Sequence, residues 1–229
     1  MLEWWVAEWI PQGGRVFVDV GANAGTWTEW LAPRFTRGHA VEPDPDALAS
    51  LCANAPANVE IHPVGAWHSA ATLRFSRFAA SVHTSAYFVQ EGINTGPSIG
   101  SLELPCLPID ALDIEGPVDF LKCDTEGAEV EVLRGAARLV ARDRPWMLVE
   151  VHSADNCLTL TRMLADWAYL FTLIRHPEYQ PYTRLWYSHC WLSCQPLEWA
   201  DPTHAKQPAR RICPAGSVPP PPPSSAGRS

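Results

Sequence analysis

The residues best suited to chemistry follow apolar runs of the sequence, where a buried strand would end. One run, residues 15–20, contains Asp19 and leads into the glycine-rich loop 21–25, after which a helical pattern begins. Glycines let the backbone turn sharply and let a ligand approach the main chain, and a helix N-terminus offers free N–H groups. Asp19 is placed to hold the loop amides or to meet an amino group of the ligand. The pattern therefore predicts a ligand site at this loop.

The spacing of the loop narrows the class of ligand. A dinucleotide-binding loop has the pattern G-x-G-x-x-G, whereas Asn23 and Thr26 occupy the second and third glycine positions here. Glu42 ends the next apolar run, 21 residues after Gly21, and a carboxylate there is placed to accept both hydroxyls of a ribose. We therefore expect a nucleotide ligand without a pyrophosphate. The alternative is a turn that merely needs glycine, with Glu42 as a solvated or helix-capping residue.

Two later runs are followed by a cluster of titratable residues. Asp124 follows run 118–123, and run 146–151 contains Glu150 and is followed by His152. Because the carboxyl ends of parallel strands meet at one edge of a sheet, these three side chains should converge beside the loop. They could form a general base, His152, with an orienting carboxylate. They could also hold a divalent metal ion, which we favour less, or form a structural network of ion pairs.

Lys122 belongs to the same cluster. It lies within an apolar run, and a buried ammonium group is costly unless a carboxylate pairs with it. Lys122 and Asp124 are two residues apart on a strand and share one face. Asp124 and Glu150 are thus the expected partners of Lys122, close to further acidic side chains at Glu126 and Glu129.

The scaffold for these residues follows from the periodicity of the chain. Short apolar runs alternate with helical patterns, which predicts a parallel sheet flanked by helices. The expected strands are 15–20, 38–42, 59–64, 118–123 and 146–151, with further extended segments at 71–77 and 102–107. The expected helices are 26–33, 45–54 with Asp44 as N-cap, 127–139 and 157–167. Segments 169–175 and 184–192 should form an antiparallel pair. The fold class is therefore α/β, a doubly wound, mostly parallel sheet with an antiparallel C-terminal strand pair.

Other segments depart from this rhythm. Residues 1–14 should form a short N-terminal helix ahead of a domain spanning 15–200. Residues 78–100 are rich in serine, threonine and glycine, which is typical of a loop or flap. Residues 201–229 end in a proline- and serine-rich stretch with little apolar area, so we expect a disordered tail. The 78–100 loop and the tryptophan-rich C-terminal third should define the acceptor of the reaction.

The composition of the chain limits the classes of protein to which it could belong. The chain has 229 residues, of which 47% are hydrophobic and 18% charged, as expected for one folded domain. Its net charge of −8 and its scattered arginines make a nucleic-acid partner unlikely. Its 7 cysteines have irregular spacings that do not indicate a disulfide framework. We find no membrane-spanning run and no features of a signal peptide, so a cytoplasmic protein acting on a small molecule is expected.

Several motifs together resemble one family. In order and at similar spacings, the chain contains segments that are similar to the FkbM family of methyltransferases: VFVDVGANAGTWT, AVEPDP, LPIDALD, LKCDTEGAEVEVLRGA and LVEVH. The resemblance extends over roughly residues 15–155, and its most specific part is the D-x-E-G-A-E block. It implies a Rossmann-like class I methyltransferase fold and S-adenosylmethionine as cofactor. It also implies methylation of a hydroxyl group of a sugar, polyketide or other metabolite.

The resemblance assigns roles to individual residues as well. The glycine loop would surround the methionine part of the cofactor, Glu42 would hold the ribose, and Gly65 and Ala66 would approach the adenine. The full expected cofactor site is Asp19, Gly21, Asn23, Gly25, Glu42, Gly65, Ala66 and Asp124. The residues themselves, and not the resemblance, suggest that His152, oriented by Glu150 or Asp124, removes the proton of a small hydroxylated acceptor. The alternatives are an N-methyltransferase, a cofactor-binding module without catalysis, and an oxidoreductase.

Overall fold

The computed structural model describes residues 10–11, 13–78, 98–175 and 190–199. The helix expected over 1–14 therefore lies almost entirely outside the described residues, as do the tail 201–229 and most of the 78–100 loop. The first strand begins at Gly14, one residue before the expected start of the domain.

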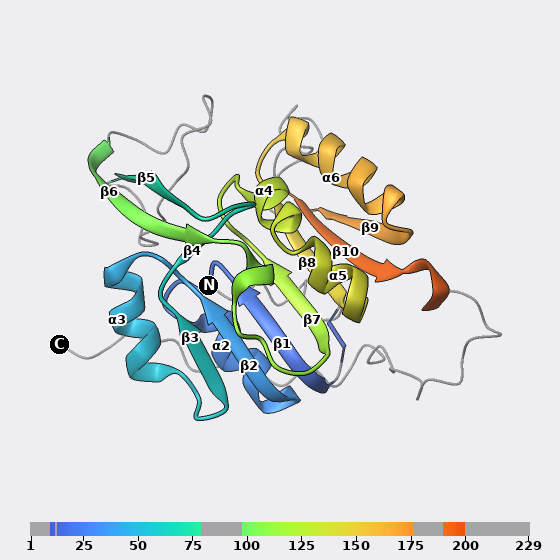
Figure 1. Cartoon of the computed structure of the whole chain (residues 1–229), viewed down its shortest axis with the longest axis horizontal. Coiled ribbons are helices and arrows are strands. Elements are labelled where there is room, and N and C mark those ends of the chain that lie inside the picture. Colours follow the sequence, from blue (N-terminus) through green and yellow to red (C-terminus); the bar gives the residue numbers. More distant parts are fainter. Residues whose placement is uncertain (1–9, 12, 79–97, 176–189, 200–229) are drawn as a thin grey trace.

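Seven strands form the main sheet in the order β3-β2-β1-β7-β8-β10-β9, side by side across the molecule (Figure 1). Those that run parallel are β1 (Gly14–Val20), β2 (Phe35–Val41), β3 (Val59–His62), β7 (Val118–Cys123) and β8 (Trp146–Val151). Between β8 and β9 (Tyr169–Arg175), antiparallel to both, lies β10 (Cys190–Pro196). The predicted fold class is confirmed. The strand order reverses at β1 and β7, and ligands of such sheets bind beyond the carboxyl ends of the strands at this point.

Helices cover both faces of the main sheet (Figure 1). One face carries α4 (Glu129–Arg134), α5 (Ala137–Asp143) and α6 (Ala154–Asp166); the other carries α2 (Thr26–Leu31), which continues into the 3-10 turn η1 (Ala32–Arg34). In α3 (Pro45–Asn54), the Asp44 carboxylate accepts a hydrogen bond from Asp46 N at 2.9 Å, so the expected N-cap is confirmed. None of the helices described is long and apolar enough to cross a membrane.

The two faces of the sheet bury different side chains. The face under α4, α5 and α6 is mainly aliphatic, whereas the opposite face is aromatic, with the ring centroids of Trp27 and Trp191 5.8 Å apart. β2 approaches the Phe17 ring closely because residue 38 is glycine, and a Cβ there would overlap the ring. Trp191 is buried in this core. It is absent from the lining of the cavity, and the expectation that the C-terminal third defines the acceptor stays a prediction.

A second sheet lies beyond the carboxyl ends of the parallel strands (Figure 1). It has three strands in the order β4-β6-β5, formed by β4 (Gly65–Ala66), β6 (Ser98–Leu107) and β5 (Ala71–Phe78). The sequence predicted extended segments at 71–77 and 102–107 but not their pairing. β5 and β6 pair antiparallel, and β4 joins β6 in parallel. This sheet supplies one wall of the cavity described below.

The prediction of a single helix over 127–139 is wrong. The chain forms α4 and α5 instead, and they are separated at Gly135, which passes against the carbonyl oxygen of Trp67 so closely that a Cβ would overlap it. Because α5 starts anew, its first turn needs its own hydrogen-bond acceptor. The Asp110 carboxylate accepts from two backbone N–H groups of that turn, at 2.9 and 2.8 Å.

Two other boundaries differ from expectation. The helix expected at 157–167 begins at Ala154, because the Ser153 hydroxyl accepts a hydrogen bond from Asn156 N (3.1 Å) and caps the helix earlier. The last strand, expected over 184–192, continues to Pro196, because it is hydrogen-bonded to a strand on each side. Residues 184–189 lie outside the described residues.

Replacing Asp110 by Ala should lower the free energy of unfolding by about 1 kcal/mol, because the first turn of α5 loses an acceptor shared by two N–H groups. Urea denaturation followed by circular dichroism measures the change. Asp155→Ala is the control: this carboxylate is exposed on α6, where Ser153 remains as the cap, and its loss should change stability by less than about 0.5 kcal/mol. Equal losses in the two variants would contradict the role of Asp110.

Candidate active site

The loop after β1 is built from left-handed residues. Gly21, Asn23 and Gly25 have φ values of +74°, +50° and +97°, a region that favours glycine. A Cβ at Gly21 would overlap the backbone oxygen of Asp124, so only glycine lets the loop pass over the end of β7. Gly21 N also donates to Val41 O (3.0 Å), which joins the loop to the end of β2.

A buried ion pair lies directly beneath this loop. Lys122 Nζ donates to Gly21 O at 3.0 Å and lies 3.2 Å from Asp19 Oδ1 and 3.3 Å from Asp124 Oδ2. Burial lowers the pKa of Lys122, but Asp19 and Asp124 outweigh it and raise the pKa above its usual range. Lys122 therefore stays charged. The expected pairing with Asp124 is present, and the pairing with Asp19 was not expected.

Asp19 is placed differently from the expectation. Its side chain is 0% exposed, and its Oδ2 accepts a hydrogen bond from the Thr28 hydroxyl at 2.6 Å. Asp19 is therefore oriented toward Lys122 and α2, below the loop, and is absent from the lining of the cavity. This corrects its expected role as a cofactor contact: Asp19 positions the loop.

Glu42 joins the loop to the end of β2. Its Oε2 accepts from Asn23 N and its Oε1 from Asp44 N, both at 2.8 Å. Burial raises the pKa of Glu42 to about 7, although the two backbone N–H groups oppose the rise. The carboxyl group therefore changes charge close to neutral pH, at the edge of a cavity.

The cavity lies between the carboxyl ends of β1, β2 and β7 and the second sheet. It encloses about 730 Å³ of empty space, part of it at an open mouth. Its lining includes most of the residues expected to bind the cofactor: Gly21, Asn23, Glu42, Gly65, Ala66 and Asp124. An apolar wall faces them, formed by Trp67, Leu73 and Phe75. Gly25 is not in the lining; it is the residue before α2.

The cluster of titratable residues surrounds one imidazole. His152 Nδ1 lies 2.8 Å from Glu129 Oε1, while Nε2 lies 3.3 Å from Glu126 Oε2. Glu150 Oε2 and Asp124 Oδ1 are 3.8 and 3.9 Å from the same Nε2. The expected convergence of Asp124, Glu150 and His152 is therefore present, and two further carboxylates complete it.

These carboxylates decide the charge of His152. Burial lowers its pKa, but Glu129 and Glu150 outweigh burial and hold the pKa well above its usual range. A protonated imidazole has no lone pair with which to accept a proton. His152 is also buried and absent from the lining of the cavity. The expectation that His152 is the base does not fit this geometry, and its surroundings make it a cationic anchor for the carboxylates.

Glu126 is the residue that the sequence analysis missed as a site residue. It lines the cavity, and burial, with help from Asp124, raises its pKa to about 7 even though His152 lowers it. Its backbone has φ +55° and is followed by Gly127 at φ +110°, a tight turn that places Glu126 in the lining of the cavity. The signal was present in the D-x-E-G-A-E block, where a Glu-Gly pair follows the strand after two residues.

Comparisons with known proteins identify the family of the chain. The model of the methyltransferase FkbM domain matches residues 19–171. The chain belongs to the FkbM methyltransferase family. No curated protein matches this FkbM chain.

One solved structure shows the same fold for this FkbM chain. The FkbM methyltransferase from Methylobacillus flagellatus KT has a TM-score of 0.57 and 21% identity, over 79% of this chain and 43% of that one. This chain thus spans less than half of that protein. An rRNA methylase from Streptococcus thermophilus (TM-score 0.49, 13% identity, 84% and 92% covered) and the N-methyltransferase NodS from Bradyrhizobium japonicum WM9 (0.49, 11%, 84% and 90%) are similar as well.

The geometry of this FkbM site also bears on the metal alternative. Asp124, Glu150 and His152 each offer one ligand atom. These three atoms lie within 4.8 Å of one another, so they could surround a divalent ion. However, the Lys122 ammonium already occupies one side of Asp124, and a metal would have to displace the proton of His152. The arrangement therefore resembles a network of ion pairs more than a preformed metal site.

The pKa of Glu42 predicts a pH-dependent affinity for the expected cofactor product, S-adenosylhomocysteine. When the pH falls below the Glu42 pKa of about 7, Glu42 becomes a neutral carboxyl group and accepts hydrogen bonds from hydroxyl groups more weakly. Calorimetry should therefore show weaker binding as the pH falls from about 8 to about 6. Glu42→Gln should bind weakly at both pH values, whereas Glu103→Gln, at an exposed position of β6, should behave like the wild type. A wild-type affinity independent of pH would contradict the role of Glu42.

Proposed function

We propose that the protein transfers a methyl group from S-adenosylmethionine to a hydroxyl oxygen of a small metabolite or sugar. The observation that carries this proposal is the carboxyl group of Glu126, which borders the cavity beside the glycine loop and has a pKa of about 7. A hydroxyl acceptor has to lose a proton as it is methylated, and a base works best when its pKa lies near the working pH. A neutral amine acceptor can attack the methyl group without first losing a proton, so it does not need such a base.

The charge of the cavity supports this cofactor. Asp124, Glu126 and Glu42 place carboxyl groups around it, which favours a ligand carrying a sulfonium and an ammonium group. The same charges oppose the pyrophosphate of a dinucleotide. Glu42 would accept hydrogen bonds from the ribose hydroxyls, and the adenine would lie between Ala66 and the apolar side chains of β5. S-adenosylmethionine supplies an electrophilic methyl group on sulfur.

The roles of the protein's own residues follow. The carboxylate form of Glu126 accepts the proton of the acceptor hydroxyl, while the oxygen–carbon bond forms and the carbon–sulfur bond breaks. The sulfur leaves as a neutral thioether, so the charges balance. His152 does not touch the acceptor; as a cation 3.3 Å from Glu126 it is a positioning residue. Glu129 holds His152 from the other side, and is itself bound by Asn156 Nδ2 at 2.9 Å.

The base is tested by Glu126→Gln, which keeps the shape of the side chain and removes its ability to accept a proton. Once a screen of hydroxylated sugars and metabolites has identified an acceptor, kcat should fall by about 10²–10⁴, while the affinity for S-adenosylhomocysteine stays nearly unchanged. Transfer of radiolabelled methyl groups measures the rate. Glu131→Gln is the matched control, because Glu131 pairs with His68 on the surface of α4. Wild-type turnover in Glu126→Gln would overturn the assignment, and a product methylated at nitrogen would overturn the proposed O-methylation.

The positioning role of His152 predicts a change in the pH profile. In the wild type, kcat should decline as the pH falls below about 7, because Glu126 becomes protonated. The His152 cation lowers the pKa of Glu126, so its removal in His152→Asn should raise that pKa. The decline should then begin at a higher pH. If His152 were itself the base, its removal would abolish activity at every pH, and the profile would not shift.

A further inference from the structure

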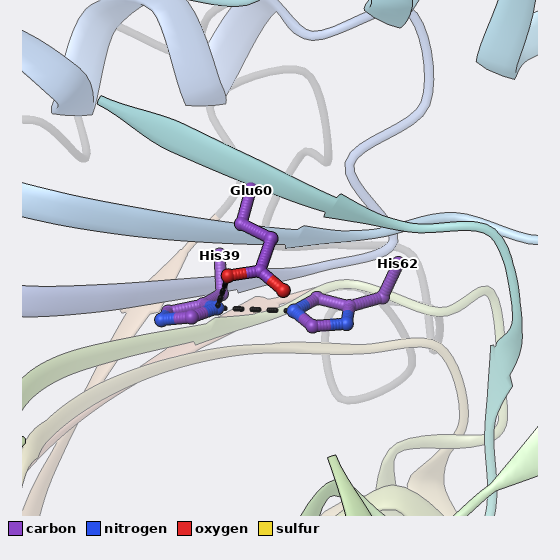
Figure 2. Close-up of side chains that lie close together, drawn as sticks. All are labelled: His39, Glu60 and His62. Atoms are coloured by element: carbon purple, nitrogen blue, oxygen red, sulfur yellow. Dashed lines mark hydrogen bonds and ion pairs between the residues drawn. The ribbon is translucent and has the colours of Figure 1, made fainter. Parts of the chain in front are cut away.

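A second cluster of titratable side chains lies on β2 and β3, at the edge of the main sheet. In their parallel register, His39 is opposite Glu60, and Val41 is opposite His62. Side chains two residues apart on a strand share a face, so His39, Glu60 and His62 project on the same side. Figure 2 shows the two imidazoles facing each other, with the Glu60 carboxylate over the gap between their nitrogens.

The distances within this cluster suit a shared ion. His39 Nδ1 lies 3.0 Å from His62 Nε2 and 3.8 Å from Glu60 Oε2, and the three ligand atoms all lie within 4.8 Å of one another. Ligand atoms around a tetrahedral ion with bonds of about 2.0–2.1 Å are about 3.3 Å apart. Small side-chain movements would therefore bring all three to one centre. We propose that His39, Glu60 and His62 bind a divalent transition-metal ion, with zinc as the foremost candidate.

The protonation state of the two imidazoles supports this site. Burial, and then the neighbouring His62, lowers the pKa of His39 to about 4, and burial lowers the pKa of His62 as well. Both rings are therefore neutral near pH 7. Because neutral imidazole is the form that coordinates a metal, few protons compete with the ion.

The donor set separates this site from the cluster around His152. Two imidazoles and one carboxylate are the donors found in several zinc centres, and they leave a fourth position open. Magnesium prefers oxygen donors in an octahedral arrangement, which these three residues do not offer. Glu60 and His62 are partly exposed, so an ion can reach the site from solvent.

Two features limit the affinity. Arg37 Nη2 lies 3.0 Å from the Glu60 oxygen that faces His39, so a guanidinium group competes with the ion for this carboxylate. His39 Nε2 has no hydrogen-bond partner among the described residues. The acceptor that usually orients a metal-bound imidazole is thus not found among them. We therefore expect affinity in the micromolar range.

Binding would connect the edge strand more firmly to the sheet. Among the strands that the structure describes, β3 pairs with β2 alone in the main sheet, and His62 O accepts a hydrogen bond from Glu42 N at 3.1 Å, next to the cavity. An ion that binds the folded chain stabilises it in proportion to the logarithm of its concentration over its Kd. Saturating zinc should therefore raise the melting temperature by several degrees, and a chelator should reverse the rise.

The test uses the full chain, freed of metal, with Zn²⁺ alone in calorimetry and Co²⁺ as a spectroscopic probe. We expect one saturable zinc site and a visible cobalt spectrum typical of tetrahedral coordination by nitrogen and oxygen. His62→Ala and Glu60→Gln should each weaken zinc binding at least tenfold. Arg37→Gln should strengthen it several-fold, because the competing cation is gone. His68→Ala, which removes a half-exposed histidine elsewhere, should change nothing.

Several outcomes would overturn the proposal. One is no saturable zinc binding by the wild type, which would leave His39 and His62 as a hydrogen-bonded neutral pair. Another is binding that is kept in His62→Ala but lost in Glu150→Gln, which would place the ion at the other cluster. A thiolate-to-cobalt charge-transfer band would place it on cysteines. If circular dichroism shows that His62→Ala does not fold, the Arg37→Gln variant is the test in its place. A zinc affinity equal to that of the wild type in Arg37→Gln would contradict the site.

Discussion

The site depends on one buried ammonium group, that of Lys122. It joins two regions that are far apart in the sequence: the end of β1 and the glycine loop, through Asp19 and Gly21 O, and the end of β7, through Asp124. A buried charge is stable only when its partners are in place, and removal of one partner typically costs about 3–5 kcal/mol. The fold therefore needs these pieces in one arrangement, and the cavity forms above them.

The same cation divides the acidic side chains into two groups. Burial raises the pKa of Asp124, but Lys122 and His152 outweigh burial and lower it, so Asp124 remains ionised. Lys122 has only a small effect on Glu42 and Glu126, so burial raises their pKa values to about 7, in Glu126 even with the His152 cation 3.3 Å away. The carboxyl groups at the cavity thus include a permanent anion and two groups that change charge near neutrality. This is a suitable arrangement for holding a cationic ligand while a proton is removed nearby.

The histidines show how neighbours, rather than residue type, decide chemistry. His152 and His39 are both buried, and burial lowers the pKa of each. Four carboxylates surround His152 and outweigh that effect, so it is a cation. His39 faces another imidazole and one carboxylate shared with Arg37, so it stays neutral. The first can anchor anions, whereas the second can offer a lone pair to a metal.

The sequence by itself determined the fold class, the glycine loop, the position of Glu42 at the end of β2, and the pairing of Lys122 with Asp124. These features depend on periodicity and on residues close together in the chain, where local geometry decides the outcome. Only the tertiary structure decided that Glu126 borders the cavity while His152 is enclosed by carboxylates, that β4, β5 and β6 form a second sheet, and that Gly135 interrupts a helix beside Trp67. The proximity of His39 and His62 also needed the register of β2 and β3. Such contacts depend on how distant segments pack, and spacing along a single chain does not contain that information.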